Sequence, residues 1–531
     1  MLIKFIVSLL PLMVYMYLKT KKSFHMLQQN WYNDGNRYIK WINKNIKKIF
    51  LNTELLFVLF FVIKYINNIL GMILVVTFYV ILSLKILRNS KLEQTKKPLV
   101  FTKRVKRLLI TTFILYLIPI VIFSIIFKES NLYIYYLIIG LLIYINYYVV
   151  YLANIINKPI EKLINDNFKK KAIKKLENMN NLKVIGITGS YGKTSSKNIL
   201  NDILNVKYNS LPTPKNFNTP VGLIITINNY LDKFTDLFIA EMGAFKQGEI
   251  KELCDLVHPT YGILTTIGTA HLDSFGSREN IQKGKFELIE SLPSDGIGIL
   301  NADDPYQVSY KLKNKVKIVW IGIDNEADVK ASNIKLTSDG TTFDVAFKGD
   351  LKKYKFETKL LGKANVYNIL AGIALGYNLG ISVQKLIMGV KKVTPVEHRL
   401  ELKKMGSINI IDDAYNSNPV GSKMALDVLG MMPGKKIIVT PGMIEMGTEE
   451  YEINKTFGKQ IADTCDEVIL IGQNQTKPIY EGLIEKKYSK TKIHVLDDVK
   501  LAFPLFNRLA DKETYVLLEN DLPDIFNEDM K

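Results

Sequence analysis

The stretch VIGITGSYGKTSSKN, residues 184–198, contains the residue types that bind phosphate groups. Gly189 and Gly192 let backbone N–H groups point at phosphate oxygens, and the helix expected after them adds its positive end. The Lys193 amine would reach the β- and γ-phosphates of a nucleotide, and the Thr194 hydroxyl would reach a magnesium ion. The spacing is a short G-x-x-G-K-T, which does not match the longer Walker pattern. The stretch therefore predicts a nucleotide site made by Gly189, Ser190, Tyr191, Gly192, Lys193, Thr194 and Ser195.

Two further apolar strands end in residues that suit the same site. DLFIAEMG ends one strand in Glu241, and YGILTTIGTAHLDSFGS ends another near His271. In an open parallel sheet, ligands bind at the carboxyl ends of the strands, so the phosphate loop, Glu241 and His271 should meet in one crevice. A carboxylate and an imidazole there suit a magnesium ion that bridges nucleotide and substrate. Taken singly, Glu241 also fits a surface acid and His271 a satisfied core histidine.

The elements that position these residues follow from the pattern of strands and helices. KVIGIT is a buried-strand pattern, GSYGKT is a turn and SSKNILNDIL has helical spacing. This texture predicts a central α/β ATP-binding domain of the P-loop type over residues 181–392. Short apolar strands such as KKIIVTPG and EVILIG predict a second, Rossmann-like α/β domain over residues 393–531.

The first third of the chain has a different composition. Long apolar runs occupy residues 2–18, 55–69, 71–87, 108–127 and 132–154 and predict a multi-pass α-helical membrane domain over residues 1–157, with about five spans. A basic linker is expected over residues 158–180. The alternative for the first run, a signal peptide, lacks a small-residue cleavage site.

Charge orients this predicted domain. Segments 19–53, 88–107 and 158–175 are rich in lysine and arginine, and basic loops stay cytoplasmic. Five spans, with the N-terminus outside and the catalytic part in the cytosol, place all three basic segments on the cytoplasmic side. Trp31–Phe50 interleaves aromatic residues with lysines, which predicts an interfacial helix on anionic headgroups; a solvated loop is the alternative.

Composition narrows the class of protein. The 531 residues carry a net charge of +19 and are 48% hydrophobic, and because the basic residues flank apolar runs they favour membrane lipid as a partner over nucleic acid. The two cysteines, Cys254 and Cys465, form no CxxC pair. They argue against a disulfide framework or a zinc ribbon and favour a reducing compartment.

The ordered blocks GITGSYGKTSSKN, NFNTPVG, AEMG, IGTAHLDSFGS, KGKFELIESLP, LNADDP, GKANVYNILAGIA, EHRLE and DDAYNSNP resemble the Mur ligases, ATP-dependent enzymes that add amino acids to the peptidoglycan stem. NFNTP and DDAYNSNP are most similar to the branch that joins D-alanyl-D-alanine to a UDP-N-acetylmuramoyl-tripeptide. The resemblance implies that ATP phosphorylates a carboxylate of the acceptor and that an amine attacks the acyl phosphate. It covers residues 181–450 well.

The resemblance also implies roles for single residues. Lys193 would contact the γ-phosphate, Thr194 and Glu241 would hold one magnesium ion, and His271 would sit at a second. Lys285 matches a lysine that is carbamylated in many members, with Lys283 as a nearby competitor. The remaining matches are Asn301 and Asn368 at adenine, Arg399 near the phosphates, and Asp413, Tyr415, Asn416 and Asn418 in a loop over the nucleotide.

The chain departs from the family in its acceptor half. Membrane spans stand where the soluble enzymes have a domain for the uridine nucleotide, which opens the option of a lipid-linked acceptor. Ala364 replaces a usual histidine, Gly442 an aspartate, and Leu517–Phe526 a basic KGS loop. The resemblance implies that the added amine is D-alanyl-D-alanine or a similar amino compound.

Three other functions compete with a wall-precursor ligase. The first is a related ligase that acts on poly-γ-glutamate, folyl-glutamate or another polymer. The second is a catalytically idle membrane scaffold, against which the joint presence of the predicted site residues argues. The third is a transporter, which no chain of acidic residues within the apolar runs supports.

Overall fold

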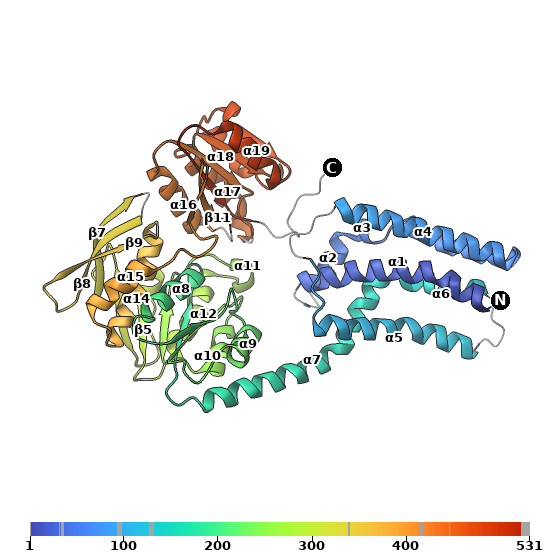
Figure 1. Ribbon diagram of the computed structural model, residues 1–531, viewed down its shortest axis with the longest axis horizontal. Coiled ribbons are helices and arrows are strands. Elements are labelled where there is room, and N and C mark those ends of the chain that lie inside the picture. The colour runs from blue at the N-terminus through green and yellow to red at the C-terminus, as the bar shows by residue number, and fades with distance from the viewer. Residues whose placement is uncertain are drawn as a thin grey trace. The chain divides into compact units, whose positions relative to one another are not determined.

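The computed structural model describes residues 2–30, 32, 37–92, 98–126, 132–337, 340–406, 408–414, 418–444 and 446–521. The chain folds as two compact units, Met1–Asn167 and Phe168–Lys531. The second unit contains two β-sheets, each with its own core (Figure 1).

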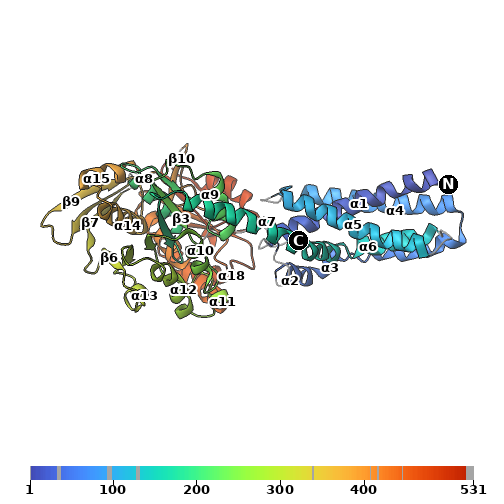
Figure 2. The ribbon, with the colours of Figure 1, turned by 90° about the horizontal axis from the view of Figure 1, so that it is seen from below.

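The first unit is built of helices. They are α1 (Leu2–Gln29), α2 (Arg37–Lys44), α3 (Ile46–Ile49), the 3₁₀ helix η1 (Glu54–Tyr65), α4 (Asn68–Leu92), α5 (Lys103–Ile126), α6 (Leu132–Tyr144) and α7 (Asn146–Glu177), the last of which continues into the second unit. Figures 1 and 2 show α1, α4, α5 and α6 running side by side. Residues 158–180, predicted as a linker, are mostly helical, because they form the second half of α7 and the turn after it.

Two described helices are long and apolar enough to cross a membrane, at Asn68–Arg88 and Lys103–Phe123. A third span results if Tyr133–Tyr144 and Asn146–Glu177, bent by 73° at their junction, are taken as one. The sequence predicted about five. The apolar residues 55–87 form two helical segments, since η1 ends at Tyr65 and α4 begins at Asn68. Two separate segments are what a helical hairpin in this region requires.

Trp31–Phe50, predicted as an interfacial helix, differs from that expectation where it is described. It forms two short helices, α2 and α3, and the apolar face of α2 is covered by protein: Tyr38 and Ile42 are fully buried, and the Tyr38 hydroxyl lies 2.6 Å from Ser23 Oγ of α1. The apolar face of α2 is therefore removed from water by packing on α1, and contact of this segment with headgroups stays a prediction.

The central domain is a nine-stranded sheet covered on both faces, in the order β2-β3-β1-β4-β5-β6-β7-β8-β9, parallel up to β7 and antiparallel from there. Its strands are β1 (Lys183–Thr188), β2 (Ser210–Pro212), β3 (Leu237–Glu241), β4 (Tyr261–Leu264), β5 (Ile297–Asn301), β6 (Lys317–Gly322), β7 (Val329–Thr337), β8 (Gly340–Phe347) and β9 (Lys353–Thr358). Its helices are α8 (Lys193–Leu204), α9 (Pro220–Asn229), α10 (Glu249–Val257), α11 (Leu272–Phe275), α12 (Arg278–Glu290), α13 (Pro305–Val308), α14 (Lys363–Asn378) and α15 (Val383–Lys392).

Alternation along the strands builds two cores in this domain. Ile185 and Ile187 of β1 point to the face covered by α8, α14 and α15, whereas Val184 points to the face covered by α9, α10 and α12. Because both faces are buried, β1 and β3 read as continuous apolar runs, as strands of covered parallel sheets do. The end of α7 belongs to the second core through the fully buried Ala172.

Strand order creates the crevice. β1 lies between β3 and β4: the chain runs from β1 to β2 and β3 on one side, and then crosses from β3 to β4 on the other side. The loops after β1, β3 and β4 therefore open together at the carboxyl edge, which is where ligands bind in such sheets.

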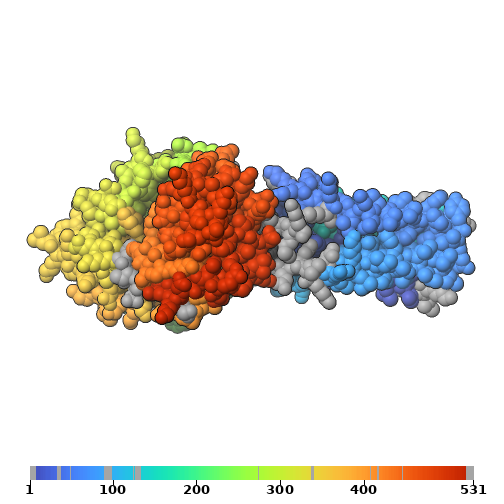
Figure 3. All heavy atoms as spheres, turned by 90° about the horizontal axis from the view of Figure 1, so that it is seen from above, coloured from blue at the N-terminus to red at the C-terminus, as the bar shows by residue number. Residues whose placement is uncertain are grey.

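The C-terminal domain is a six-stranded sheet in the order β10-β11-β15-β12-β13-β14, in which only the β10–β11 pair is antiparallel among the described pairs. Its strands are β10 (Glu401–Met405), β11 (Ile408–Asp413), β12 (Lys435–Thr440), β13 (Glu467–Ile471), β14 (Ile493–Leu496) and β15 (Thr514–Glu519). α16 (Pro419–Met431), α17 (Glu450–Ala462) and α18 (Lys477–Glu485) cover one face and α19 (Ala502–Leu509) the other, with the short 3₁₀ turns η2 (Gly447–Glu449), η3 (Lys490–Lys492) and η4 (Val499–Leu501) in the loops. The dark orange and red spheres of Figure 3 belong to this domain.

Candidate active site

The phosphate loop leaves β1 and enters α8 through two glycines in conformations that L-residues rarely adopt. Gly192, with φ 78°, is the N-cap of α8, and Gly189 has φ 151°. A Cβ on Gly189 would lie 2.0 Å from Thr265 Oγ1, so no other residue fits there without a shift. Gly189 and Gly192 therefore set the path that turns the first N–H groups of α8 toward a ligand.

The loop after β4 braces the phosphate loop. The Ser190 N–H donates to Thr266 O at 2.7 Å, and Thr265 Oγ1 donates to Tyr191 O at 2.6 Å. The Gly268 N–H in turn donates to Ser190 Oγ at 2.9 Å. Ser190 is buried and its hydroxyl serves this brace, whereas Tyr191 and Ser195 are half-buried.

Lys193 folds back over its own loop. Its Nζ donates to Gly189 O at 2.6 Å and to Ser190 O at 3.3 Å. Burial lowers the pKa of the Lys193 amine to about 8, although the Glu241 carboxylate acts in the opposite direction. A triphosphate in the loop offers this amine stronger, anionic acceptors than two carbonyl groups.

Thr194 and Glu241, predicted as one metal site, are in contact. Thr194 Oγ1 donates to Glu241 Oε1 at 3.1 Å, and Asn218 Nδ2 donates to the same oxygen at 3.1 Å. The second carboxylate oxygen lies 2.9 Å from Lys197 Nζ. Asn218 and Lys197 were not among the predicted site residues. Two signals could have found them: Asn218 belongs to the NFNTPVG block that resembles the family, and Lys197 follows Lys193 by one helical turn and so lies on the same face of the helix.

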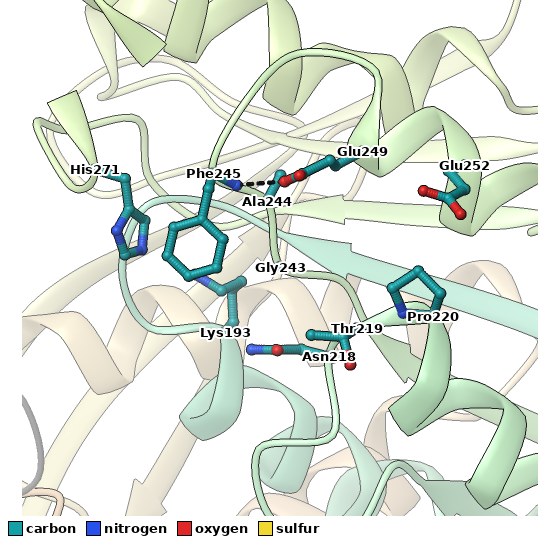
Figure 4. A pocket seen from close by; sticks show the side chains of 10 residues that line it. All are labelled: Lys193, Asn218, Thr219, Pro220, Gly243, Ala244, Phe245, Glu249, Glu252 and His271. Atoms are coloured by element: carbon teal, nitrogen blue, oxygen red, sulfur yellow. Dashed lines mark hydrogen bonds between the residues drawn. The ribbon is translucent and has the colours of Figure 1, made fainter. Parts of the chain in front are cut away.

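A pocket of about 340 Å³ opens beside this pair. Figure 4 shows His271 and Phe245 next to each other on one side, and Asn218, Thr219 and Pro220 along another. His271 is the N-cap of α11 with φ 61°, and its ring centroid lies 4.4 Å from that of Phe245. His271 thus reaches the same pocket as Lys193, as predicted from the ends of β1 and β4.

Lys285 approaches the pocket from behind its wall. It is 1% exposed on α12, its Nζ donates to the pocket residue Ala244 at the carbonyl oxygen, 3.3 Å away, and the amine lies 5.2 Å from the Phe275 ring centroid. Burial, assisted by the charge of Lys193, holds the pKa of Lys285 well below its usual value. The competitor Lys283 is exposed. Lys285 is therefore no helix-surface lysine.

A magnesium ion bound with a nucleotide fits these residues. The described part of the chain holds no group of three or more His, Cys, Asp or Glu side chains that would bind a metal by itself. Mg²⁺ needs no such group, because it commonly takes one or two protein oxygens and completes its shell with phosphates and water. Thr194 and Glu241 supply such oxygens next to the phosphate loop.

The two predicted adenine residues are both buried, with different surroundings. Asn301, at the end of β5, uses its Oδ1 to accept the Asp303 N–H at 3.0 Å, which is turn chemistry. Asn368 of α14 lies beside the phosphate loop, since a Cβ on Gly192 would be 3.6 Å from Asn368 Oδ1.

The C-terminal residues fall into three groups. Burial raises the pKa of Asp413 to about 6, and the positive charge of Arg399 acts in the opposite direction. The charge of Arg399 also lowers the pKa of Lys193. Asn418 caps α16 by accepting the Gly421 N–H at 2.8 Å. Tyr415 and Asn416 lie outside the described residues.

Each of the two β-sheet domains matches a known protein family domain. Residues 187–376 match the Mur ligase middle domain, and residues 398–519 match the Mur ligase glutamate ligase domain. The chain is 30% identical over 342 residues to the UDP-N-acetylmuramoyl-tripeptide–D-alanyl-D-alanine ligase of Buchnera aphidicola subsp. Acyrthosiphon pisum, an alignment that covers 63% of this chain and 73% of the relative. The chain belongs to the Mur ligase family.

Both matched domains of this Mur ligase lie in the second unit. It is 34% identical over 296 residues to the Bacillus subtilis ligase of the same name, covering 55% of this chain but only 63% of that protein, so it spans less than two thirds of this relative. A crystal structure of the MurF ligase from Thermotoga maritima in complex with ADP superposes with a TM-score of 0.60 and 28% identity, over 67% of this chain and 80% of that one. Helices α1 to α6 lie outside both matched domains.

Proposed function

We propose that this Mur ligase is an ATP-dependent, ADP-forming amide ligase of peptidoglycan-precursor synthesis. It would join D-alanyl-D-alanine, or a similar amine, to the carboxylate of a muramoyl-peptide acceptor. The observation that carries the proposal is the meeting of phosphate loop, Thr194 and Glu241 at one sheet edge, beside a pocket that reaches His271. The named activity of the relatives supports it.

The proposed reaction has two steps. The acceptor carboxylate attacks the γ-phosphate of ATP, which gives an acyl phosphate and ADP; the amine then adds to the acyl carbon, and the tetrahedral intermediate releases inorganic phosphate. A bound magnesium ion would neutralise phosphate charge. Both steps depend on positioning and charge neutralisation, which the loop N–H groups and the Lys193 amine supply.

The other residues have proposed roles consistent with their places. His271 and a carbamylated Lys285 would serve a second magnesium ion, since a carbamate offers hard anionic oxygen where a neutral amine does not. Asn368 would face adenine more directly than Asn301, whose carbonyl oxygen is engaged in a turn. Arg399 and Asp413 would move over the nucleotide with the C-terminal domain, and its closure would exclude water from the acyl phosphate.

The first unit is proposed to be a multi-pass anchor in the cell membrane, with the catalytic unit in the cytoplasm. Many of its outward side chains are apolar, such as Leu84 at 60% and Ile110 at 61% exposure, while Lys19 and Glu54 pair inside at 2.6 Å. That distribution suits lipid rather than water as the surrounding solvent. A lipid-linked acceptor is the variant of the function that this anchor favours over a UDP-linked one.

The test is turnover by the purified full-length protein with ATP, Mg²⁺ and D-alanyl-D-alanine. Two acceptors are compared: UDP-N-acetylmuramoyl-tripeptide and its lipid-linked counterpart. We expect ADP and phosphate release that depends on an acceptor, and Lys193→Ala should lower it at least about a hundredfold while membrane insertion is unchanged. Full turnover by that variant would remove the phosphate loop from the mechanism.

A further inference from the structure

Lys197 is a buried lysine that has no role in the proposed reaction. It lies in the second turn of α8 and is 1% exposed, as is Glu241 of β3. The two form an ion pair across 2.9 Å. Removing two charges from water costs several kcal/mol for each ion, and apolar residues of the same volume often stabilise a core as well or better. Stability alone therefore does not explain why a lysine and a glutamate are buried together here.

The partners of Glu241 are divided between its two oxygens. Oε1 accepts from Thr194 and Asn218, both at 3.1 Å, and it is the oxygen that faces the phosphate loop. Oε2 faces Lys197. Among the described residues Oε2 accepts no hydrogen bond, so the charge of Lys197, 2.9 Å away, is what opposes rotation of the carboxylate and keeps the oxygen beside Thr194 in its direction.

Lys197 also holds the segment that supplies Asn218. Its Nζ donates to Lys215 O at 2.5 Å, and Lys215 has a left-handed backbone with φ 48°. The same segment continues to Thr219 and Pro220, which line the pocket. One ammonium group thus joins α8, the end of β3 and the pocket wall.

We propose that Lys197 is a positioning residue that aims the Glu241 carboxylate at the divalent cation of the nucleotide. The assignment rests on the proposed function, since the cation enters the site with ATP. Lys197 touches neither cation nor substrate and acts through Glu241 and the Lys215 carbonyl group. Partners of metal ligands typically change metal affinity by about 10–100-fold when they are removed.

The experiment measures Mn²⁺ binding to the full-length protein by electron paramagnetic resonance, with a non-hydrolysable ATP analogue present. Lys197→Gln should raise the Mn²⁺ dissociation constant by about 10–100-fold. Leu200→Ala is the matched control, because Leu200 is fully buried on the same helix and belongs to the core below it. It should lower the melting temperature and leave the dissociation constant within about twofold of wild type.

A second readout uses the protein without metal or nucleotide. Lys197→Gln leaves a buried carboxylate unpaired, so its melting temperature should fall, and adding Glu241→Gln should restore part of the loss. If Lys197→Gln alone does not fold, recovery of the fold in the double variant supports the pairing, and failure to recover overturns it.

The outcomes separate the two proposals. Wild-type protein that binds no Mn²⁺ with the analogue overturns the proposed function and the positioning role together. Wild-type binding with an equal dissociation constant in folded Lys197→Gln overturns the positioning role alone.

Discussion

The two sides of the crevice each bury a lysine, and the two lysines have opposite surroundings. On the α8 side, Lys197 meets the Glu241 carboxylate and a backbone carbonyl. On the α12 side, Lys285 meets the Ala244 carbonyl and the ring of Phe275, and among the described residues no carboxylate pairs with it. Both are 1% exposed, so burial alone does not distinguish them.

The difference lies in the form of the amine that each site favours. A counter-charge at 2.9 Å suits an ammonium ion, as at Lys197. Burial without one lowers the pKa of Lys285 and favours the neutral amine. A neutral amine is the nucleophile that adds to carbon dioxide, so the surroundings of Lys285 suit the carbamate proposed above, whereas Lys197 lies in an ion pair.

Replacing each lysine by a neutral residue should change stability in opposite directions. Lys197→Gln should lower the free energy of unfolding by about 3–5 kcal/mol, because it leaves the buried Glu241 carboxylate without its counter-charge. Lys285→Met should leave it unchanged or raise it, because methionine fills the space without a buried polar amine. Urea unfolding of the metal-free proteins measures both. A large loss in Lys285→Met would mean that the two environments are alike.

The same Lys285→Met protein should lose turnover by about 10²–10³-fold, the range found when one charge-stabilising group is removed from an active site. Wild-type turnover should rise with added bicarbonate, and mass spectrometry under mild conditions should find carbon dioxide on the peptide that contains Lys285. Lys283→Met is the control and should keep its activity, since Lys283 is exposed on the same helix. Equal activity in both variants would show that the buried amine is not used.

Lys193 provides the smallest and most quantitative test, because its partners are two neutral carbonyl groups and its pKa is lowered to about 8. Below pH 8 the amine is protonated in both folded and unfolded protein, so it adds no pH dependence. Between pH 8 and about 10.4 the unfolded chain binds more protons, so stability should rise with pH, by about 3 kcal/mol in total.

Lys193→Met should lack that part of the rise. The comparison of unfolding midpoints for wild type and variant from pH 7 to 10 isolates it from other titrating groups. Parallel curves would mean that the amine is solvated as in the unfolded chain.

Several features of the site could be predicted because they follow from chain order. Thr194, Glu241 and His271 come after strands β1, β3 and β4, and parallel neighbouring strands bring their carboxyl ends to one edge. The role of Asn418 could not, because an Asn-Pro step fits a helix cap as well as a ligand contact, and the structure uses it as the cap of α16. The number of spans could not be predicted either: about five were expected, whereas two described helices, or three spans with the bent α6–α7 pair, are long and apolar enough to cross a membrane. The segment before α4 is a 12-residue 3₁₀ helix rather than a long α-helix.

The sequence by itself determined the phosphate loop, the order of strands and helices, and the apolar character of the first unit, since each depends on neighbouring residues along the chain. Only the tertiary structure decided which buried lysine meets a carboxylate. Lys197 and Lys285 both sit in polar helical stretches, and their ionic state depends on groups from other segments: Glu241 and the Lys215 carbonyl for one, Ala244 and Phe275 for the other. Electrostatic energy depends on distance through space, and those distances are fixed only when the helices pack on the sheet.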